Sequence, residues 1–460
     1  MAINDLGYKE WDLDPTHGNQ QWRTIARFGI RITWRSAWLR RIFIMAWIPI
    51  FIMGIILFVI EQSIQDVNSD DLPQTVGRFF VAGIISQRPE INNLTVLTQW
   101  SKQADVLTGF LAGLVNDSDN ELGDINSNRE SRFASLRRIM RGEIEFTVKD
   151  LEFVASLSDE SLAIATDYLN NRRVEQFKRA IGSRGGGPPP TVYQQSFSSV
   201  KRSRTTALEL IEFDRDGNEV IDFRELVNYM RPTLWSEVLF YFFRLPQAFT
   251  VVVVIGMVAP KLISRDMKNR AFLLYYSRPI TPWQYIFGKC AVVWAFLAGL
   301  TTLPAFMLYL LGLSLSPDIS VFLLTWQLLF QILLASIILC IPTTLFALTL
   351  SSLTRESRLA SFGWFAIWIM GSVSYGILTF FELMLGLRQQ ELPASTDQVI
   401  SATNRWSWLS PMRTLENLQA WVFGIEQDLG NINISFTLVG LVCLCCLILL
   451  RRRVDAPIRV

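Results

Sequence analysis

Long apolar segments alternate with polar stretches along this chain. An α-helix needs about 20 predominantly apolar residues to cross the hydrocarbon core of a bilayer. Six segments meet that requirement, so the sequence predicts an all-α, polytopic membrane protein with six transmembrane helices. The predicted spans are Ile42–Ile60, Val238–Val258, Ala291–Gly312, Val321–Leu350, Leu359–Leu385 and Ile434–Leu450.

Two charged residues lie inside the predicted spans. Arg244 belongs to the second span, where its guanidinium either snorkels to the nearer interface or faces a substrate path. Glu382 lies close to the end of the fifth span, where it either ends the helix or lines a cavity.

A polar insert, residues 61–235, separates the first span from the second. Its periodicity predicts helices at Val148–Ala155, Asp159–Leu169 and Arg172–Ile181, with Ser158 as the N-cap of the middle one. The linker 182–196, which begins GSRGGGPPP, separates these helices from a smaller unit at 197–231. The five remaining spans form a second region, residues 236–450, which contains a long loop at 386–433.

The segment before the first span is basic and amphipathic. Residues 1–20 are polar and predict a mobile tail, whereas residues 21–41 predict a helix that lies in the membrane interface. Six arginines and no acidic residue lie between Trp22 and Arg41. A simple basic flank that only sets topology is the alternative interpretation.

Composition supports a membrane protein, and charge predicts its orientation. Hydrophobic residues make up 50% of the chain, whereas the formal net charge is only +2. Basic residues gather in four segments that six crossings place on one side, namely Trp22–Arg41, Pro260–Lys289, Arg355–Arg358 and the tail 451–460. By the positive-inside rule that side is the cytoplasm, which puts both termini inside and the insert outside.

The insert contains a motif that resembles an EF-hand calcium loop, Asp214–Glu225. Ca²⁺ takes six to eight oxygen ligands, and a twelve-residue loop supplies them from fixed positions. The expected ligands are Asp214, Asp216, Asn218, the Val220 carbonyl, Asp222 and Glu225. A solvated acidic turn between two helices is the alternative.

Position six of this loop departs from the EF-hand pattern. Glycine is usual there because the backbone turns with a positive φ, but this chain has Glu219, at a cost of about 1 kcal/mol. EF-hands also usually pair. The best candidate for a second loop begins at Asp119, and it lacks a side-chain oxygen at Gly123 and an apolar residue at Asn126.

The stretch Pro260–Lys289 resembles the first cytoplasmic loop of the permease subunits of export-type, ABC-2 type ABC transporters. The matching positions are Ile263, Asp266, Ala271, Leu274, Arg278-Pro279-Ile280, Tyr285 and Gly288-Lys289. The family more often has Glu where Asp266 stands. An interfacial elbow helix before the first span and a Trp-rich LSP element, here Trp406–Pro411, are also common in that family.

The resemblance implies a permease that is driven by a separate ABC ATPase, in a complex with two permeases and two ATPases. The residues expected to couple the two subunits are Arg265, Asp266, Arg278, Pro279 and Lys289. ATP would bind only to the partner, because this chain has no P-loop: Gly288-Lys289-Cys290 lacks the first glycine and the hydroxyl residue of that motif.

Other classes of function fit the sequence less well. Without regularly spaced arginines or a filter-like loop, a calcium-responsive channel is disfavoured. A single histidine, His17, argues against His-based catalytic sites and against an enzyme. A mechanotransmission complex that drives an outer protein partner stays open. The five cysteines all lie in or beside spans, so the insert has no disulfides, and we expect a bacterial inner membrane and no nucleic-acid partner.

Overall fold

The computed structural model describes residues 21–65, 72–101, 145–163, 166, 197–214, 217–269, 280–316, 320–389, 405–425 and 429–455. Within these ranges the fold is helical apart from one two-stranded antiparallel sheet, so the all-α prediction is confirmed. The expected tail 1–20, the linker 182–196, the helix Arg172–Ile181 and the candidate loop at Asp119 lie outside the described residues.

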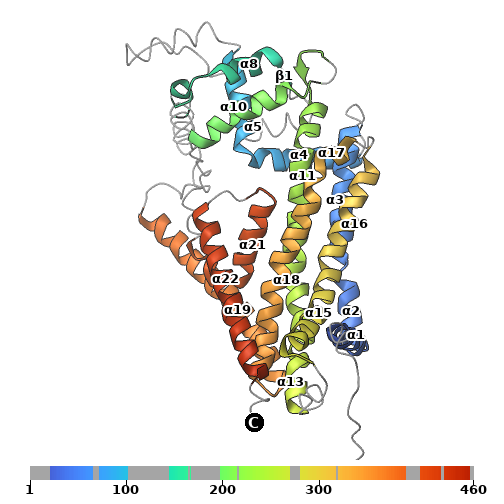
Figure 1. Ribbon diagram of the computed structural model, residues 1–460. Coiled ribbons are helices and arrows are strands. Elements are labelled where there is room, and N and C mark those ends of the chain that lie inside the picture. The colour runs from blue at the N-terminus through green and yellow to red at the C-terminus, as the bar shows by residue number, and fades with distance from the viewer. Residues whose placement is uncertain are drawn as a thin grey trace, which may run out of the picture.

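Six helical segments are long and apolar enough to cross a membrane, which confirms the predicted number of spans. They are Ala37–Gln62, Phe223–Lys268, Pro282–Leu315, Gln327–Leu353, Ser357–Glu382 and Gly430–Val454. Figure 1 shows them as a bundle of roughly upright helices. Helices suit this environment because they satisfy every backbone N–H and C=O within one segment.

The N-terminal part differs from the single helix predicted at 21–41. Helix α1 (Gln21–Trp34) ends before Ser36, and α2 (Ala37–Met45) begins after it. The Ser36 side chain accepts a hydrogen bond from the Leu39 backbone N–H, so this residue is an N-cap that starts a new helix. The first span therefore begins at α2 and continues into α3 (Ile48–Gln65), earlier than the predicted start at Ile42.

One long helical rod connects the two ends of the bundle. It consists of α11 (Phe223–Pro246), the π-helix η4 (Gln247–Val251), α12 (Val252–Val258) and α13 (Pro260–Lys268). The helix that follows the EF-hand-like loop thus passes through Pro232 into the second span without a break. We call the α13 end of the bundle the basic end, because exposed Lys261, Arg265 and Lys268 lie there together with Arg451–Arg453.

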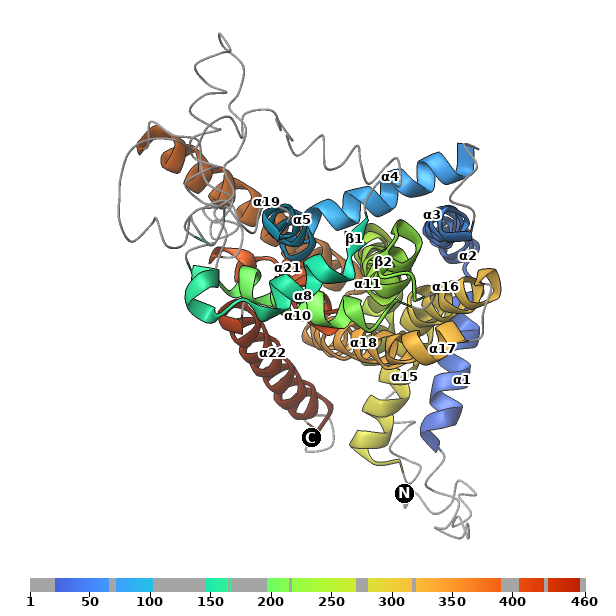
Figure 2. The same ribbon diagram turned by 90° about the horizontal axis from the view of Figure 1, so that it is seen from above.

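The opposite end carries the insert group, which we define as α4 (Leu72–Gln87), α5 (Pro89–Ser101), α8 (Val148–Ser156) and α10 (Phe197–Ile211). Figure 2 shows α4 lying across this end of the bundle. Helix α8 confirms the prediction at Val148–Ala155. The predicted cap is also present, since Ser158 Oγ accepts a hydrogen bond from the Ser161 backbone N–H at 3.2 Å.

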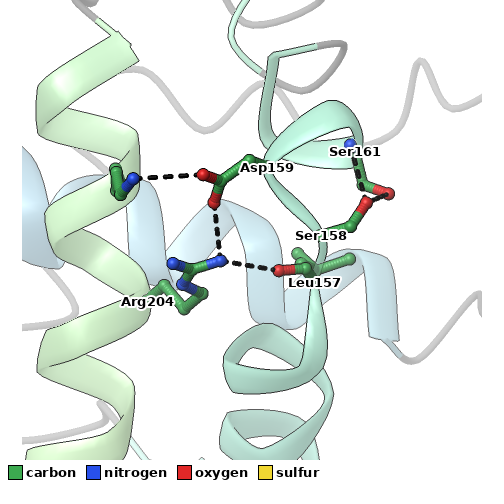
Figure 3. A network of polar contacts seen from close by, with 6 residues as sticks. Leu157, Ser158, Asp159, Ser161 and Arg204 are labelled. Atoms are coloured by element: carbon green, nitrogen blue, oxygen red, sulfur yellow. Dashed lines mark hydrogen bonds and ion pairs between the residues drawn. The ribbon is translucent and has the colours of Figure 1, made fainter.

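Polar contacts hold α10 against the segment that follows α8. Asp159 accepts hydrogen bonds from Lys201 at 3.1 Å and from Arg204 at 2.8 Å, and Arg204 also bonds the Leu157 carbonyl (Figure 3). The hydrogen bond from Lys201, aided by the charges of both basic groups, lowers the pKa of Asp159 below its ordinary value. Asp159 is therefore ionised at neutral pH, and the contact is a surface ion pair.

The remaining helices complete the bundle. They are α15 (Pro282–Leu300), α16 (Thr302–Leu315), α17 (Ser320–Thr325), α18 (Gln327–Leu353), α19 (Ser357–Gln389), η5 (Ser407–Leu409), α21 (Pro411–Val422) and α22 (Leu429–Asp455). The predicted loop 386–433 is wrong in part, because α21 and the start of α22 fall within it. Ser410 caps α21 and Pro411 takes its first position, so the LSP element begins a helix.

We predict that a methyl group at Gly288 destabilises the protein. An added Cβ at Gly288 of α15 would meet the Ile25 Cβ of α1 at 2.9 Å and the Trp22 carbonyl oxygen at 3.1 Å. We expect Gly288→Ala to lower the free energy of unfolding by about 1–3 kcal/mol, as overpacking usually does. Gly440→Ala is the control, since nothing lies within 4 Å of the corresponding Cβ. Equal melting temperatures of the two variants in detergent would contradict the close α1–α15 contact.

Candidate functional site

Helix α13 is anchored to the bundle by hydrogen bonds to its backbone. Ser351, near the end of α18, donates to the Pro260 carbonyl at 2.9 Å. The same hydroxyl accepts from the backbone N–H groups of Ile263 at 3.2 Å and Ser264 at 3.1 Å. Because Ser351 and Ser264 are both fully buried, the first turn of α13 is fixed to α18 without access to water.

A buried ion pair fixes the other end of α13. Lys289 Nζ of α15 lies 2.7 Å from Asp266 Oδ2, and the Tyr285 hydroxyl donates to the same oxygen at 2.8 Å. The Lys289 ammonium also lies 5.3 Å from the centre of the Tyr285 ring. The side chains of Lys289 and Asp266 are only 8% and 16% exposed. Asp266 therefore joins α13 to the first turns of α15.

Part of the predicted loop 260–289 is helical. Pro260–Lys268 is α13, and Tyr285 to Lys289 already belong to α15. Helix α15 starts at Pro282 because Thr281 and Gln284 form a capping box, in which each side chain bonds the other's backbone N–H. Of the predicted coupling residues, the structure brings Asp266 and Lys289 together and exposes Arg265, whereas Arg278 and Pro279 lie outside the described residues.

Helix α1 packs directly on α15. An added Cβ at Gly29 would lie 2.5 Å from Val292 Cγ2, so α1 approaches α15 closely at this glycine as well as at Gly288. The indole ring of Trp34 stacks on Phe296 of α15 with centroids 6.0 Å apart. Helices α1, α13 and α15 are thus held together as one unit. The α1 residues Arg23, Arg27 and Arg31 remain exposed, as does Arg35 just after the helix.

These features define a multi-pass membrane protein with an N-terminal helix packed beside its basic end. The sequence model of the family described as ABC-2 family transporter protein matches residues 32–451. The chain belongs to this family of membrane transport components. No curated protein and no solved structure matches the chain.

The EF-hand-like loop is a second candidate site. The carboxylate of Asp214 accepts hydrogen bonds from the backbone N–H groups of Gly217 at 2.8 Å and Glu219 at 3.2 Å. Asn218 Oδ1 accepts from the Val220 N–H at 2.7 Å. The backbone φ is +70° at Gly217 and +57° at Glu219. Glu219 thus adopts the left-handed conformation expected at position six although it is not glycine.

Asp222 begins the helix that leaves this loop. Its carboxylate accepts from the Glu225 N–H at 2.8 Å, and its carbonyl accepts from Leu226, so Asp222 is the N-cap of α11. In the described part of the chain, no group of three or more His, Cys, Asp or Glu side chains lies close enough to hold a metal ion. Asp216, a predicted ligand, lies outside the described residues.

The loop has a partner that the sequence pattern does not predict. Strand β2 (Val220–Ile221) pairs antiparallel with β1 (Phe146–Thr147), and Ile221 opposes Phe146. The Val148 N–H also donates to the Glu219 carbonyl at 2.9 Å. Helix α8 follows β1 as α11 follows β2, so the two segments form a pair of strand–helix units. The one sign of this strand in the sequence is the apolar residue Phe146, which lies just before the start of a predicted helix.

We predict that removing the negative charge of Asp266 destabilises the protein, because the Lys289 ammonium would remain buried without its counter-ion. Breaking a buried ion pair on one side typically costs about 3–5 kcal/mol. Asp266→Asn should therefore lower the melting temperature, and adding Lys289→Gln should recover part of the loss. Lys149→Gln is the control, because its 3.9 Å contact with Glu219 is exposed. If Asp266→Asn left the melting temperature unchanged, the Asp266–Lys289 pair would not fix α13.

Proposed function

We propose that this chain is the permease subunit of an ATP-driven ABC exporter, and that a separate ATPase subunit binds at its basic end. The observation that supports this most is the setting of α13. It is anchored to α15 and α18, it continues the second span, and it leaves Lys261, Arg265 and Lys268 exposed. A movement of α13 would therefore be passed directly into the membrane helices.

The basic end is, in this proposal, cytoplasmic. The exposed arginines of α1, the basic residues of α13 and Arg451–Arg453 all lie there, as the positive-inside rule requires of a cytoplasmic surface. Both termini are then inside, and the insert group lies outside, where it is placed to meet an extracytoplasmic protein. The membrane we propose is a bacterial inner membrane.

In the proposed cycle, the partner binds and hydrolyses ATP, and this chain passes the resulting movement to its membrane helices. ATP binds to the ATPase only, and closure of that subunit displaces α13 together with α1 and α15. A permease dimer, either homo- or heteromeric, provides the path between two such chains. A mechanotransmission complex would use the same coupling but would move an outer partner, whereas a calcium-responsive channel would need no ATPase.

Charge reversal on the exposed side of α13 tests the proposed contact. In the complex with its ATPase, we expect Arg265→Glu to weaken retention of the ATPase by more than about tenfold, because juxtaposed like charges at an interface cost several kcal/mol. Retention is measured by quantitative mass spectrometry after affinity purification. Arg224→Glu is the control, since Arg224 is also exposed and lies at the other end of the bundle. If both variants retained the ATPase equally, α13 would not form part of the interface with it.

We also propose that Ca²⁺ binds at Asp214–Glu225. The donor set consists of hard carboxylate, amide and carbonyl oxygens, which suits Ca²⁺. Positive φ at Glu219, the bonds to the Asp214 carboxylate and the capping by Asp222 support the EF-hand interpretation over a solvated turn. Because the rod begins at Phe223, inside the twelve-residue loop, calcium would stiffen the connection between the insert group and the second span.

Calcium should stabilise the protein through Glu225. At a calcium concentration about ten times Kd, binding adds about 1.4 kcal/mol to the free energy of unfolding. We expect millimolar calcium to raise the melting temperature relative to chelator, and Glu225→Gln to abolish that rise. Glu212→Gln, which changes an exposed carboxylate just before the loop, should keep it. A calcium response that survives Glu225→Gln would place the ion elsewhere.

A further inference from the structure

Three charged side chains meet between α11 and α21. Arg244 Nε lies 2.8 Å from Glu416 Oε1, and Arg413 NH1 lies 3.0 Å from Glu416 Oε2. The Arg413 guanidinium also lies 5.1 Å from the centre of the Tyr375 ring of α19. We call Arg244, Arg413 and Glu416 the charge cluster. The sequence leaves two alternatives for Arg244, a snorkelling side chain or one that faces a substrate path, and the cluster shows its contacts.

The cluster carries an uncompensated positive charge. Two guanidiniums share one carboxylate, so one positive charge has no counter-ion within the cluster. Among the residues that the structure describes, Glu416 has the only carboxylate within 4 Å of either guanidinium. Both arginine side chains are 36% exposed, whereas Glu416 is only 8% exposed. The excess charge therefore faces outward from the protein, and the carboxylate lies beneath it.

One member of the cluster, Arg244, belongs to a candidate membrane-spanning segment. Arg244 lies inside the apolar segment Phe223–Lys268, and the π-helix η4 starts three residues after it. π-Helical turns inside α-helices occur frequently at functional sites. A charged side chain at membrane depth is costly, and such residues mark substrate or ligand contacts by default. A partly exposed guanidinium in this position thus favours an anionic neighbour from outside the chain.

We propose that Arg244 and Arg413 bind the anionic headgroup of an amphiphile through a phosphate or carboxylate. The planar guanidinium presents paired N–H donors that match the oxygens of these groups. The candidate membrane span that carries Arg244 favours an amphiphile over a soluble ion, because the apolar part of such a ligand can remain in hydrocarbon. The site does not depend on the ATPase contact, so either proposal can fail without the other.

A second arginine in the chain provides the matched control. Arg405 pairs with Glu382 at 3.1 Å and lies 5.6 Å from the centre of the Trp406 ring, so it repeats the glutamate and aromatic contacts of Arg413. The Arg405–Glu382 pair differs from the charge cluster in net charge, because it has one arginine and one glutamate. Arg405 is also 68% exposed. We therefore expect no excess anion binding at Arg405.

The test uses the full chain in nanodiscs of phosphatidylcholine with a photoactivatable phosphatidylglycerol probe. We expect cross-links to peptides of α11 or α21, and Arg413→Gln should lower the cross-link yield about tenfold, the loss of one charge-assisted hydrogen bond. This variant should fold, since Arg244 and Glu416 remain as a neutral pair. Glu416→Gln should raise the yield, because it increases the positive excess. Arg405→Gln should leave the yield unchanged.

Two results would overturn the proposal. Equal yields for the native chain and Arg413→Gln, with both proteins folded by thermal unfolding, would show that the cluster binds no anionic headgroup. Competition by inorganic phosphate identifies the source of the anion. If phosphate at millimolar concentration displaced the probe completely, the site would bind a soluble anion in preference to the amphiphile, which would contradict the proposal.

Discussion

The buried ion pair between Glu61 and Arg231 joins the first span to the rod at the end of the bundle that carries the insert group. Glu61, at the end of α3, lies 3.2 Å from Arg231 of α11 and also accepts a hydrogen bond from the Trp235 indole at 2.9 Å. Glu61 and Arg231 are 0% and 3% exposed, so separating them would leave a charge in an apolar core. Arg88 and Glu237 add a second pair at 3.1 Å. The first and second spans are thereby joined where the insert group begins.

That junction fixes one end of the rod from α11 to α13. One end of the rod starts at the EF-hand-like loop and packs against the first span, and the other end is held by Ser351 and Asp266. Between the ends, Trp364 of α19 donates to the Val252 carbonyl at 2.8 Å, and an added Cβ at Gly256 would meet Phe365 at 2.5 Å. Close packing transmits displacement because protein interiors are poorly compressible. A displacement of α13 would therefore also displace the helices that pack against the rod.

The sequence predicted the features that depend on local pattern. Length and apolarity located six spans, and the spacing of oxygen-bearing side chains located a loop whose Glu219 has the expected positive φ. Features that depend on distant partners were missed. Phe146 pairs with Ile221 across 75 positions, and Asp266 finds Lys289 only once α13 and α15 are packed. The sequence predicts a loop where α21 forms, because α21 is short and carries Arg413 and Glu416. Arg244, which pairs with Glu416, is far away in the chain.

Purification of the protein from its native membranes in a mild detergent tests most directly whether it works with an ATPase. Mass spectrometry would identify the co-purifying chains, and an assay would follow ATP hydrolysis. An ABC ATPase subunit in stoichiometric amount, with hydrolysis that vanadate inhibits, is the predicted result. A partner-free oligomer without hydrolysis would contradict the proposed coupling at α13 and would turn attention to conductance with and without calcium.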